Sequence, residues 1–330
     1  MTNEMNIDQR VLPYLQTNAR EALGVSDFTG ADIEKLEGGD YNYNYRVRQD
    51  ECDVVVRLNI ESQSGSADHI VDEYRALEFV APHDIAPKPL FLDNTREHFP
   101  YGLLIEEYIS GGHIRFSTPA VQRAAVAMSK LHTMPIENAP LQRRENPLRG
   151  QYASGMAALE QYEQRQSPDM DLLRLCRSIM AKMVKDIPKL EGMYAPSSVI
   201  HADLNPANII DNGKSVYFID WERSRIDDPS QDVAAFFCDA QNLWASPRAL
   251  TDAEKQAFLE TYTEKTGDTT MPDRIPPRLL LFTLGTVLWG ADRIADVDEG
   301  TIDPHLGDQN YSRYQKLADP RVLEKALETY

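Results

Sequence analysis

The feature that most constrains the fold is a change in hydrophobic periodicity near residue 110. Before this point, short runs of alternating apolar and polar residues predict β-strands joined by short turns. After it, apolar residues recur three and four positions apart, which predicts helices. The chain is therefore expected to form an α+β fold, with a small antiparallel-sheet lobe in residues 1–107 and a larger, mainly helical lobe in residues 108–330.

The small lobe is expected to open with an amphipathic helix, whose apolar residues from Val11 to Leu23 have helical spacing and which ends at Gly24. One further helix is expected over 68–81, where Pro82 stops it. The strands are expected around residues 33–36, 41–47, 53–60, 89–92 and 102–108.

The helical lobe is expected to begin with a helix capped at Ser117/Thr118, with Pro119 in its first turn. Two helices are expected within 151–192, separated near Pro168, and others around 252–265, 277–295 and 320–329. Between them, residues 198–200 and 208–211 read as short strands on either side of a polar loop.

The composition indicates a globular protein of about two folded units, because the chain has 330 residues, of which 42% are apolar and 26% charged. The 52 acidic residues outnumber the 34 basic ones, which gives a net charge of −18. Such a balance argues against nucleic acid and anionic membranes as partners. The first ten residues are polar and show no secretory signal, so we expect a cytoplasmic protein, and we expect a monomer.

Two features of the sequence indicate packing rather than chemistry. The longest apolar stretch, Leu279 to Ala291, is interrupted by Thr and Gly and is shorter than the roughly 20 residues of a membrane span, so we expect a buried helix. The cysteines Cys52, Cys176 and Cys238 form no CxxC pair. We expect free thiols that pack as small hydrophobic groups, with neither disulfides nor a zinc site.

Residues 199–222, with the sequence VIHADLNPANIIDNGKSVYFIDWE, hold the most informative set of polar groups. Asp203 and Asn208 lie in the polar loop, and Asn212-Gly213 is expected to turn the chain tightly because these residues tolerate a positive φ. The turn is expected to return Asp220 to the side of the loop, so that three oxygen-bearing side chains converge.

Oxygen ligands suit Mg²⁺, which binds one or two protein carboxylates together with phosphate oxygens and water. Phosphoryl transfer needs an acid that accepts the proton of the acceptor hydroxyl, and an Asn and an Asp that hold the metal against the phosphates. The order of the residues predicts Asp203 as the catalytic base and Asn208 and Asp220 as Mg²⁺ ligands. The alternative is that Asp203 and Asn205 only cap loops, as Asx residues often do.

The pattern His201-x-Asp203-x4-Asn208 followed by Asp220 resembles the catalytic loop of the aminoglycoside phosphotransferase and choline kinase family, relatives of the protein kinases. Residues 36–42, LEGGDYN, are similar to the phosphate-covering turn of that family. The dipeptide Leu131-His132 and the segment Asp228-Pro229-x-x-Asp232 are similar to two other family motifs. The resemblance implies a bilobal protein-kinase-like fold and an ATP- and Mg²⁺-dependent small-molecule kinase that transfers the γ-phosphate to a hydroxyl group.

The same resemblance assigns further residues to the nucleotide site. Gly39 and Asn42 would cover the phosphates, and the backbone of Glu107 and Ile109 would meet adenine. The turn that carries Gly39 lacks a GxGxxG pattern, so a plain β-turn is the alternative.

Two residues are expected to support the catalytic loop. By the resemblance, Asp232 would brace it by accepting backbone hydrogen bonds, and His201 would support the site from within the loop. The alternative for Asp232 is that it only starts a helix. His132 lies on the apolar side of its helix and is expected to be a packed core histidine.

The small lobe must also supply a cation for the phosphates, and Arg57 lies in the expected strand 53–60. Glu73 lies on the apolar stripe of the helix over 68–81, where an unpaired carboxylate would be costly to bury. An Arg57–Glu73 pair satisfies both residues. Lys is common at this strand position among kinases, so Arg57 departs from the pattern in geometry but not in charge. The alternative is two solvated surface charges.

The acceptor is expected to be a small molecule, because only eleven residues separate Asp220 from Asp232 and leave no room for a peptide-docking activation segment. The net charge favours a cationic acceptor such as an amino sugar or an amino alcohol, and homoserine, thioribose and other sugars stay open. The resemblance implies a pocket lined by residues 151–192 and by the helix with Trp289 and Asp292, although Trp289 is alternatively a core residue.

Two other functions stay open at the level of the sequence. A catalytically idle member of the family would bind nucleotide as a sensor or scaffold, although the three predicted active-site residues are all present. A metal hydrolase would use His201 and Asp203 as ligands, but no further His or carboxylate lies at ligand spacing and Asn208 is a poor substitute.

Overall fold

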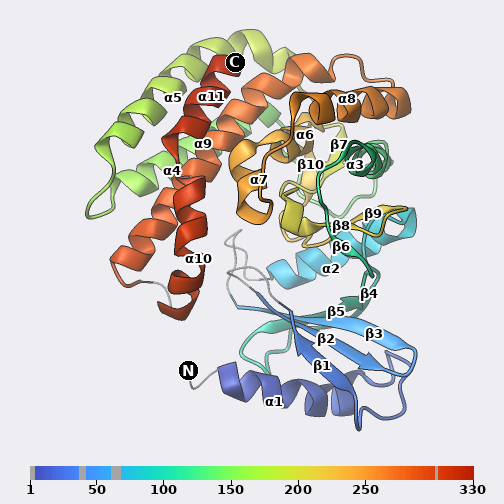
Figure 1. The fold of residues 1–330 in the computed structure, drawn as a ribbon. Coiled ribbons are helices and arrows are strands. Elements are labelled where there is room, and N and C mark those ends of the chain that lie inside the picture. The colour runs from blue at the N-terminus through green and yellow to red at the C-terminus, as the bar shows by residue number, and fades with distance from the viewer. Residues whose placement is uncertain (1–3, 37–41, 61–67, 302–303) are drawn as a thin grey trace. The chain divides into compact units, whose positions relative to one another are not determined.

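The computed structural model of the chain describes residues 4–36, 42–60, 68–301 and 304–330 (Figure 1). The chain divides into two compact units, one of Met1–Ser110 with Tyr217–Arg223 and one of Gly111–Val216 with Ser224–Tyr330. The first division falls just after the boundary expected at residue 107. The sequence did not anticipate that the segment with Asp220 belongs to the first unit. It is held there by backbone hydrogen bonds such as that from Phe218 N–H to the Ile85 carbonyl, 2.8 Å.

The first unit is built on a five-stranded antiparallel sheet of order β1-β2-β3-β5-β4. The strands are β1 Asp32–Lys35, β2 Asn42–Gln49, β3 Cys52–Asn59, β4 Pro89–Asp93 and β5 Gly102–Glu107. Helix α1 Glu4–Tyr14 continues into one π-helical turn, Leu15–Ala19, and α2 His69–Val80 ends in the 3₁₀ turn Ala81–His83. These elements fall where the alternating and helical patterns predict them.

The two faces of this sheet carry different residues because side chains alternate along a strand. Val54, Val56 and Leu58 of β3 share a buried cluster with Val11 and Leu15 of the N-terminal helical segment. Figure 1 shows α1 and α2 on opposite faces of the sheet. The face toward α2 therefore receives the intervening residues of β3, which is how a charged side chain of that strand comes to lie beside a helix.

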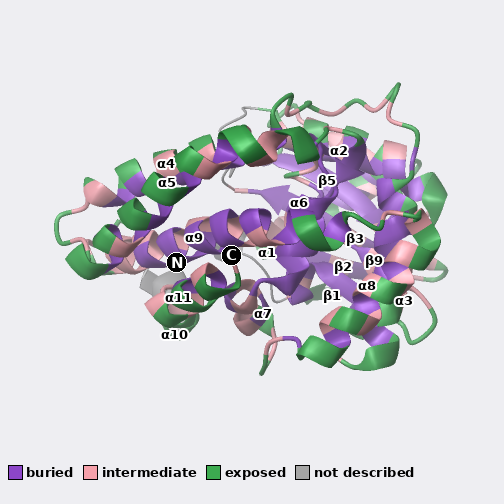
Figure 2. Cartoon of the chain, turned by 90° about the horizontal axis from the view of Figure 1, so that it is seen from above, coloured by how far each residue is buried: buried purple, intermediate pink, exposed green. Residues whose placement is uncertain are grey.

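The second unit is mainly helical. Its helices are α3 Thr118–His132, α4 Pro147–Glu163, α5 Met170–Leu190, α6 Ser230–Phe237, α7 Asp239–Ala245, α8 Asp252–Thr266, α9 Met271–Asp298, α10 Pro304–Leu317 and α11 Pro320–Thr329. Residues of α4, α5, α9 and α11 form one apolar core. Figure 2 shows α9 as a largely buried helix among the others. The stretch 279–291 lies inside α9, as expected, and no helix among the described residues is both long and apolar enough to cross a membrane.

Short strands place the polar loop in the second unit. They are β6 Gly112–His113, β7 Ser198–Ile200, β8 Ile209–Asp211 and β10 Arg225–Asp227, and β9 Val216–Phe218 carries the chain from the second unit into the first. Strand β7 pairs with β10, and β8 pairs with β6. The predicted turn at Asn212-Gly213 is confirmed: Gly213 has a φ of +84°, and the Asn212 N–H donates to the Ser215 carbonyl at 3.2 Å.

The α+β class and most helix positions predicted from the sequence are confirmed. Ser117 caps α3 by accepting from the Ala120 N–H at 3.4 Å, and the break between α4 and α5 includes Pro168. The sequence analysis missed α6, α7, α10, β6 and β10. Helices α6 and α7, of eight and seven residues, and strands β6 and β10, of two and three, are too short to show a period. Helix α10 has few apolar residues in its sequence. All three cysteines are free, and Cys176 and Cys238 are buried, as expected.

Candidate active site

The loop between β7 and β8 holds the carboxylate of Asp203 with two side-chain amides. Gln241 on α7 donates from Nε2 to Oδ1 of Asp203 at 2.8 Å. Asn208 donates from Nδ2 to Oδ2 at 3.2 Å and to the backbone carbonyl of Asp203 at 2.9 Å. Because neutral donors orient both oxygens, the carboxylate is fixed in direction without being neutralised by either contact. Asp203 does not merely cap a loop, whereas Asn205 does, since its side chain accepts from the Ala207 N–H at 2.8 Å.

Asp232 holds the backbone of the same loop from the first turn of α6. Its two carboxylate oxygens accept from the backbone N–H groups of His201, 2.8 Å, and Ala202, 2.7 Å. Burial by itself would raise the pKa of Asp232, but the hydrogen bonds from the His132 side chain and the His201 backbone outweigh it and hold the pKa below its usual value. The hydrogen bonds predicted for Asp232 are therefore present, and the residue also lies in a helix start, so the two interpretations were not exclusive.

Two histidines also help to hold the loop: His132 contacts Asp232, and His201 contacts the backbone of Asp203. His132 is buried at the end of α3, with Nε2 3.2 Å from Oδ2 of Asp232 and Nδ1 2.8 Å from the hydroxyl of Tyr262. Since the ionised Asp232 can only accept, Nε2 of His132 donates to it and Nδ1 accepts from Tyr262. The expected core histidine is confirmed, and it contacts the residue that holds the loop. His201 is fully buried, and its Nδ1 accepts from the Asp203 N–H at 3.3 Å.

The backbone is strained at two positions, one directly before Asp203 and one at Asp220. Ala202, directly before Asp203, has a φ of +69°, and Asp220 has a φ of +70°. Residues with a side chain rarely adopt this left-handed conformation, which costs of order 1 kcal/mol and persists only where the surroundings enforce it. The bond from the Ala202 N–H to Asp232 is one such constraint. Strain of this kind concentrates at functional sites, which supports a role for both positions.

The first unit carries a buried arginine surrounded by carboxylates. Arg57 on β3 lies with Nε 3.3 Å from Oε2 of Glu73 on α2, and its terminal nitrogen contacts Oδ1 of Asp220 and lies 3.8 Å from Oε2 of Glu222. Arg57 is 4% exposed and Glu73 is 1% exposed. The predicted Arg57–Glu73 pair is therefore present, and the alternative of two solvated surface charges is wrong. A backbone hydrogen bond from Trp221 to Oε1 of Glu73, 3.2 Å, ties the Asp220 segment to α2.

This cluster has more acids than bases. Burial raises the pKa of Glu73 to about 8 and that of Glu106 to about 7, even though the charge of Arg57 opposes the shift in both cases. Burial would lower the pKa of Arg57, but the surrounding carboxylates outweigh it and raise it. One guanidinium is thus shared among several buried acids, and two of these acids take up protons near neutral pH.

Asn208 in the second unit and Asp220 in the first unit each carry an oxygen of the kind that Mg²⁺ prefers. Among the described residues, no group of three or more His, Cys, Asp and Glu side chains is arranged to hold a metal ion by itself. Mg²⁺ does not need one, because phosphate oxygens and water complete its coordination. The amide nitrogen of Asn208 donates to Asp203, which directs its oxygen elsewhere, and Asp220 contributes a carboxylate. His201 is buried and hydrogen-bonded, which argues against the hydrolase alternative.

Besides Arg57 and Glu73, four residues were predicted for the nucleotide site. Gly39 lies outside the described residues, so its role stays a prediction. Asn42 begins β2 and accepts from Nδ2 of Asn59 at 2.8 Å. Glu107 ends β5 and donates its N–H to the Lys88 carbonyl at 2.9 Å, so this N–H is not available for the predicted adenine contact, and Ile109 follows the strand. The expected approach of Asp220 to Asp203 and Asn208 joins residues of different units and stays a prediction.

Three residues of these clusters were missed from the sequence. Gln241 gave no signal, because α7 itself was not predicted. Glu106 did give one, since it interrupts the apolar run of β5 and a charge in such a run is expected to have a partner. Glu222 follows Asp220 by two positions, and only the fold shows that it lies near Arg57.

Comparison with known proteins gives the following relationships. Residues 32–275 match the model of a family described as the phosphotransferase enzyme family. No curated protein matches the sequence. The fold is similar to that of a choline/ethanolamine kinase family protein from Mesorhizobium loti, with 18% identity, a TM-score of 0.64 and 98% of both chains covered.

Two further solved structures are similar at the same level. An ethanolamine kinase from Plasmodium vivax has 14% identity and a TM-score of 0.69, with 99% of this chain and 91% of that chain covered. A spectinomycin phosphotransferase, solved with ADP and spectinomycin, has 15% identity and a TM-score of 0.63, with 97% and 98% covered. At these identities the likeness concerns the fold, and the kinase-like fold expected from the sequence is confirmed.

Proposed function

Because the chain belongs to the phosphotransferase enzyme family, we propose that it uses ATP and Mg²⁺ to phosphorylate a hydroxyl group of a small molecule. The observation that carries the proposal is the placement of Asp203. Two amides orient its carboxylate, and the loop that bears it is fastened to a buried Asp232. A fixed, ionised carboxylate on a loop with strained backbone is what a general base requires.

In the proposed reaction, Asp203 accepts the proton of the acceptor hydroxyl. The acceptor oxygen forms a bond to the γ-phosphorus, the bond from that phosphorus to the β–γ bridging oxygen breaks, and ADP leaves. Asn208 and Gln241 hold the Asp203 carboxylate during this transfer, so the base does not need to reorient. Asp232 keeps the loop backbone in its left-handed turn.

Asn208 and Asp220 are the residues proposed to hold Mg²⁺, which when bound offsets the negative charge of the phosphates. Arg57 is proposed to contact the phosphates, and its fork of donors suits that role better than a single ammonium group. Its contact with Glu73, 3.3 Å from Nε to Oε2, fixes the guanidinium on β3. Gly39 and Asn42 are proposed to cover the phosphates, and the backbone of Glu107 and Ile109 to meet adenine.

The acceptor is proposed to be a small molecule. The short interval between Asp220 and Asp232 leaves no peptide-docking segment. The relatives of similar fold are described as kinases of choline or ethanolamine and of spectinomycin. The net charge of −18 attracts cations at long range, which favours amino alcohols and amino sugars, but the local charge of the binding pocket decides the final preference.

The test is nucleotide binding followed by phosphate transfer. Thermal unfolding is measured with ATP, with Mg²⁺ and with both, and ADP formation is then followed over amino sugars, amino alcohols and sugars. The proposal expects a shift in Tm that requires ATP and Mg²⁺ together, and ADP formation with at least one acceptor. A shift without transfer to any acceptor would favour a sensor or scaffold, and no shift would remove the nucleotide from the proposal.

A further inference from the structure

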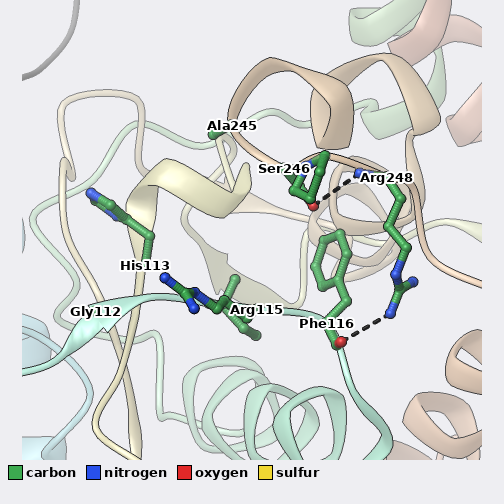
Figure 3. A pocket seen from close by; sticks show the side chains of 9 residues that line it. Gly112, His113, Arg115, Phe116, Ala245, Ser246 and Arg248 are labelled. Carbon is green, nitrogen blue, oxygen red and sulfur yellow. Dashed lines mark hydrogen bonds between the residues drawn. The ribbon is translucent and has the colours of Figure 1, made fainter.

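A pocket of about 570 Å³ lies in the second unit, between the start of that unit and the segment that joins α7 to α8 (Figure 3). Its lining residues are Gly112, His113, Ile114, Arg115, Phe116, Ala245, Ser246, Pro247 and Arg248. This volume lies within the range of small-molecule binding sites, which is roughly 300–1,000 Å³.

The charge of the lining is opposite to that of the protein. The chain has 52 acidic residues, yet none of the residues that line this pocket is acidic, and three of them are His or Arg. In a protein of net charge −18, a basic pocket is not a consequence of the average composition. It favours a ligand group of negative charge over a neutral or positive one.

Arg248 builds the pocket and is not available to a ligand. It forms a two-pronged ion pair with Glu254, with both nitrogen-to-oxygen distances 2.7 Å, and it donates to the Phe116 carbonyl at 2.9 Å. Ring contact between Phe116 and Phe236 adds to the same wall, with centroids 6.0 Å apart. The two walls are therefore joined by specific contacts, so the pocket is formed before any ligand binds.

Arg115 and His113 are the available basic groups. Both are exposed, and within the described part of the chain neither side chain has a hydrogen bond or ion pair. Figure 3 shows them on one side of the pocket, separated from Arg248 by Phe116. A guanidinium without a partner offers a fork of donors that matches a carboxylate or a phosphate.

Both walls of the pocket are connected to the proposed catalytic base. On one side, the Ile114 N–H donates to the Ile209 carbonyl at 2.9 Å, and Ile209 directly follows Asn208, which donates to Asp203. On the other side, Ala245 ends α7, the helix whose Gln241 donates to Asp203. A molecule held in this pocket is thus bound by the same elements that orient the base.

We infer that this pocket binds an anionic group of the phosphate acceptor, so that the acceptor is a hydroxy compound with a carboxylate or a phosphate. The inference rests on the proposed kinase function and refines its acceptor class. Arg115 supplies the main contact, and His113 adds donors beside it. The pocket thereby selects against the purely cationic acceptors that the net charge alone would favour.

Isothermal titration calorimetry with four matched sugars tests the inference in the absence of nucleotide. The probes are glucose, glucosamine, gluconate and glucose 6-phosphate, which share one carbon skeleton and differ in charge, gluconate being the open-chain acid and the other three pyranoses. We expect gluconate or glucose 6-phosphate to bind at least tenfold more tightly than glucose and glucosamine. The two anions also separate the two chemistries, because a preference between them identifies carboxylate or phosphate as the group that is bound.

Variants show whether the pocket is responsible. Arg115→Gln is expected to weaken the binding of the preferred anion roughly tenfold to hundredfold, and Arg115→Lys to weaken it less. Arg321→Gln, which removes an exposed arginine of α11, is the matched control and should leave the affinity unchanged. Unchanged Tm values show that the variants fold.

Three outcomes would overturn the inference: tighter binding of glucosamine or glucose than of either anion, anion binding that Arg115→Gln does not weaken, or no binding of either anion at millimolar concentration. The same samples are titrated with ATP and Mg²⁺. Loss of nucleotide binding would count against the kinase function, while the sugar titrations report on the pocket alone, so the two failures are distinguishable.

Discussion

At the scale of the residue, the chemistry depends on side chains whose charge is set by their neighbours. Asp203 stays in a polar environment of amide donors, whereas Glu73 and Glu106 are buried near one arginine. The first arrangement orients a carboxylate through two amide donors, and the second raises the pKa of carboxylates into the neutral range. The two sets of acids therefore respond differently to substitution and to pH.

Replacement of the proposed base should affect turnover rather than nucleotide binding. We expect Asp203→Asn to lower kcat by roughly 10² to 10⁴, as is typical when a general base is lost. Affinity for ATP with Mg²⁺ should stay within about twofold, because the proposed nucleotide contacts are made by other residues. Steady-state kinetics and calorimetry measure the two quantities. Glu264→Gln on α8, an exposed position, is the control, and unchanged kcat in Asp203→Asn would remove the residue from this role.

The buried acids predict a pH dependence of stability. Glu106 has a pKa of about 7 in the folded protein, above its usual value of 4.5, because it is buried. Between these two values the folded state binds a proton that the unfolded state does not, so the free energy of unfolding decreases as the pH rises from about 4.5 to about 7. The contribution of Glu106 to this decrease is about 3 kcal/mol.

Denaturant unfolding of the wild type and of Glu106→Gln at several pH values measures this contribution. The variant cannot ionise, so its free energy of unfolding should decline less steeply across the same interval. Because the charge of Glu106 also raises the pKa of Glu73, the variant lowers that pKa as well, which makes the decline less steep in the same direction. Parallel curves for the two proteins would show that Glu106 is not the group that titrates.

At the scale of the element, one buried aspartate connects a loop to two helices. Asp232 lies on α6, accepts from the backbone of the loop after β7, and contacts His132 at the end of α3. Because Asp232 accepts from three groups at once, the loop conformation is linked to the packing of these helices. The resemblance predicted the backbone contacts, but the link through His132 depended on where α3 ends relative to α6.

Asp232→Asn tests this connection with little change in volume. An amide has one acceptor oxygen and turns an NH₂ group toward one of the backbone N–H donors, so at least one buried donor loses its partner. We expect a loss of about 2 to 3 kcal/mol in the free energy of unfolding and a decrease in kcat that exceeds the change in KM. Chemical denaturation measures the free energy of unfolding, and steady-state kinetics measures kcat and KM. If the variant has the free energy of unfolding and the kcat of the wild type, the loop does not depend on Asp232.

At the scale of the whole molecule, ligand binding and stability are linked. A ligand that binds only the folded state at one hundred times its Kd raises the free energy of unfolding by about 2.7 kcal/mol. We expect ATP with Mg²⁺ to give a stabilisation of this size at that concentration, and Asp220→Ala to abolish its dependence on Mg²⁺. Thermal unfolding with ATP, with and without Mg²⁺, measures both. An unaltered Mg²⁺ requirement in the variant would show that Asp220 is not a ligand of the metal.

The sequence by itself determined what local patterns and short motifs can specify. Periodicity and caps predicted the sheet of the first unit and most helices of the second, and the order of Asp203, Asn208 and Asp220 identified the family and its chemistry. Glu73 was placed beside Arg57 because a charge on an apolar stripe requires a partner, which is a rule that needs only the sequence.

Only the tertiary structure decided which distant residues meet. Gln241 reaches Asp203, the Asp220 segment packs with the first unit, and the basic pocket joins residues 112–116 to 245–248. Each of these contacts joins segments far apart in the chain through side chains that have no periodicity and no motif. Their positions follow from how the helices and sheets pack, and packing is a property of the whole chain that no local window of sequence contains.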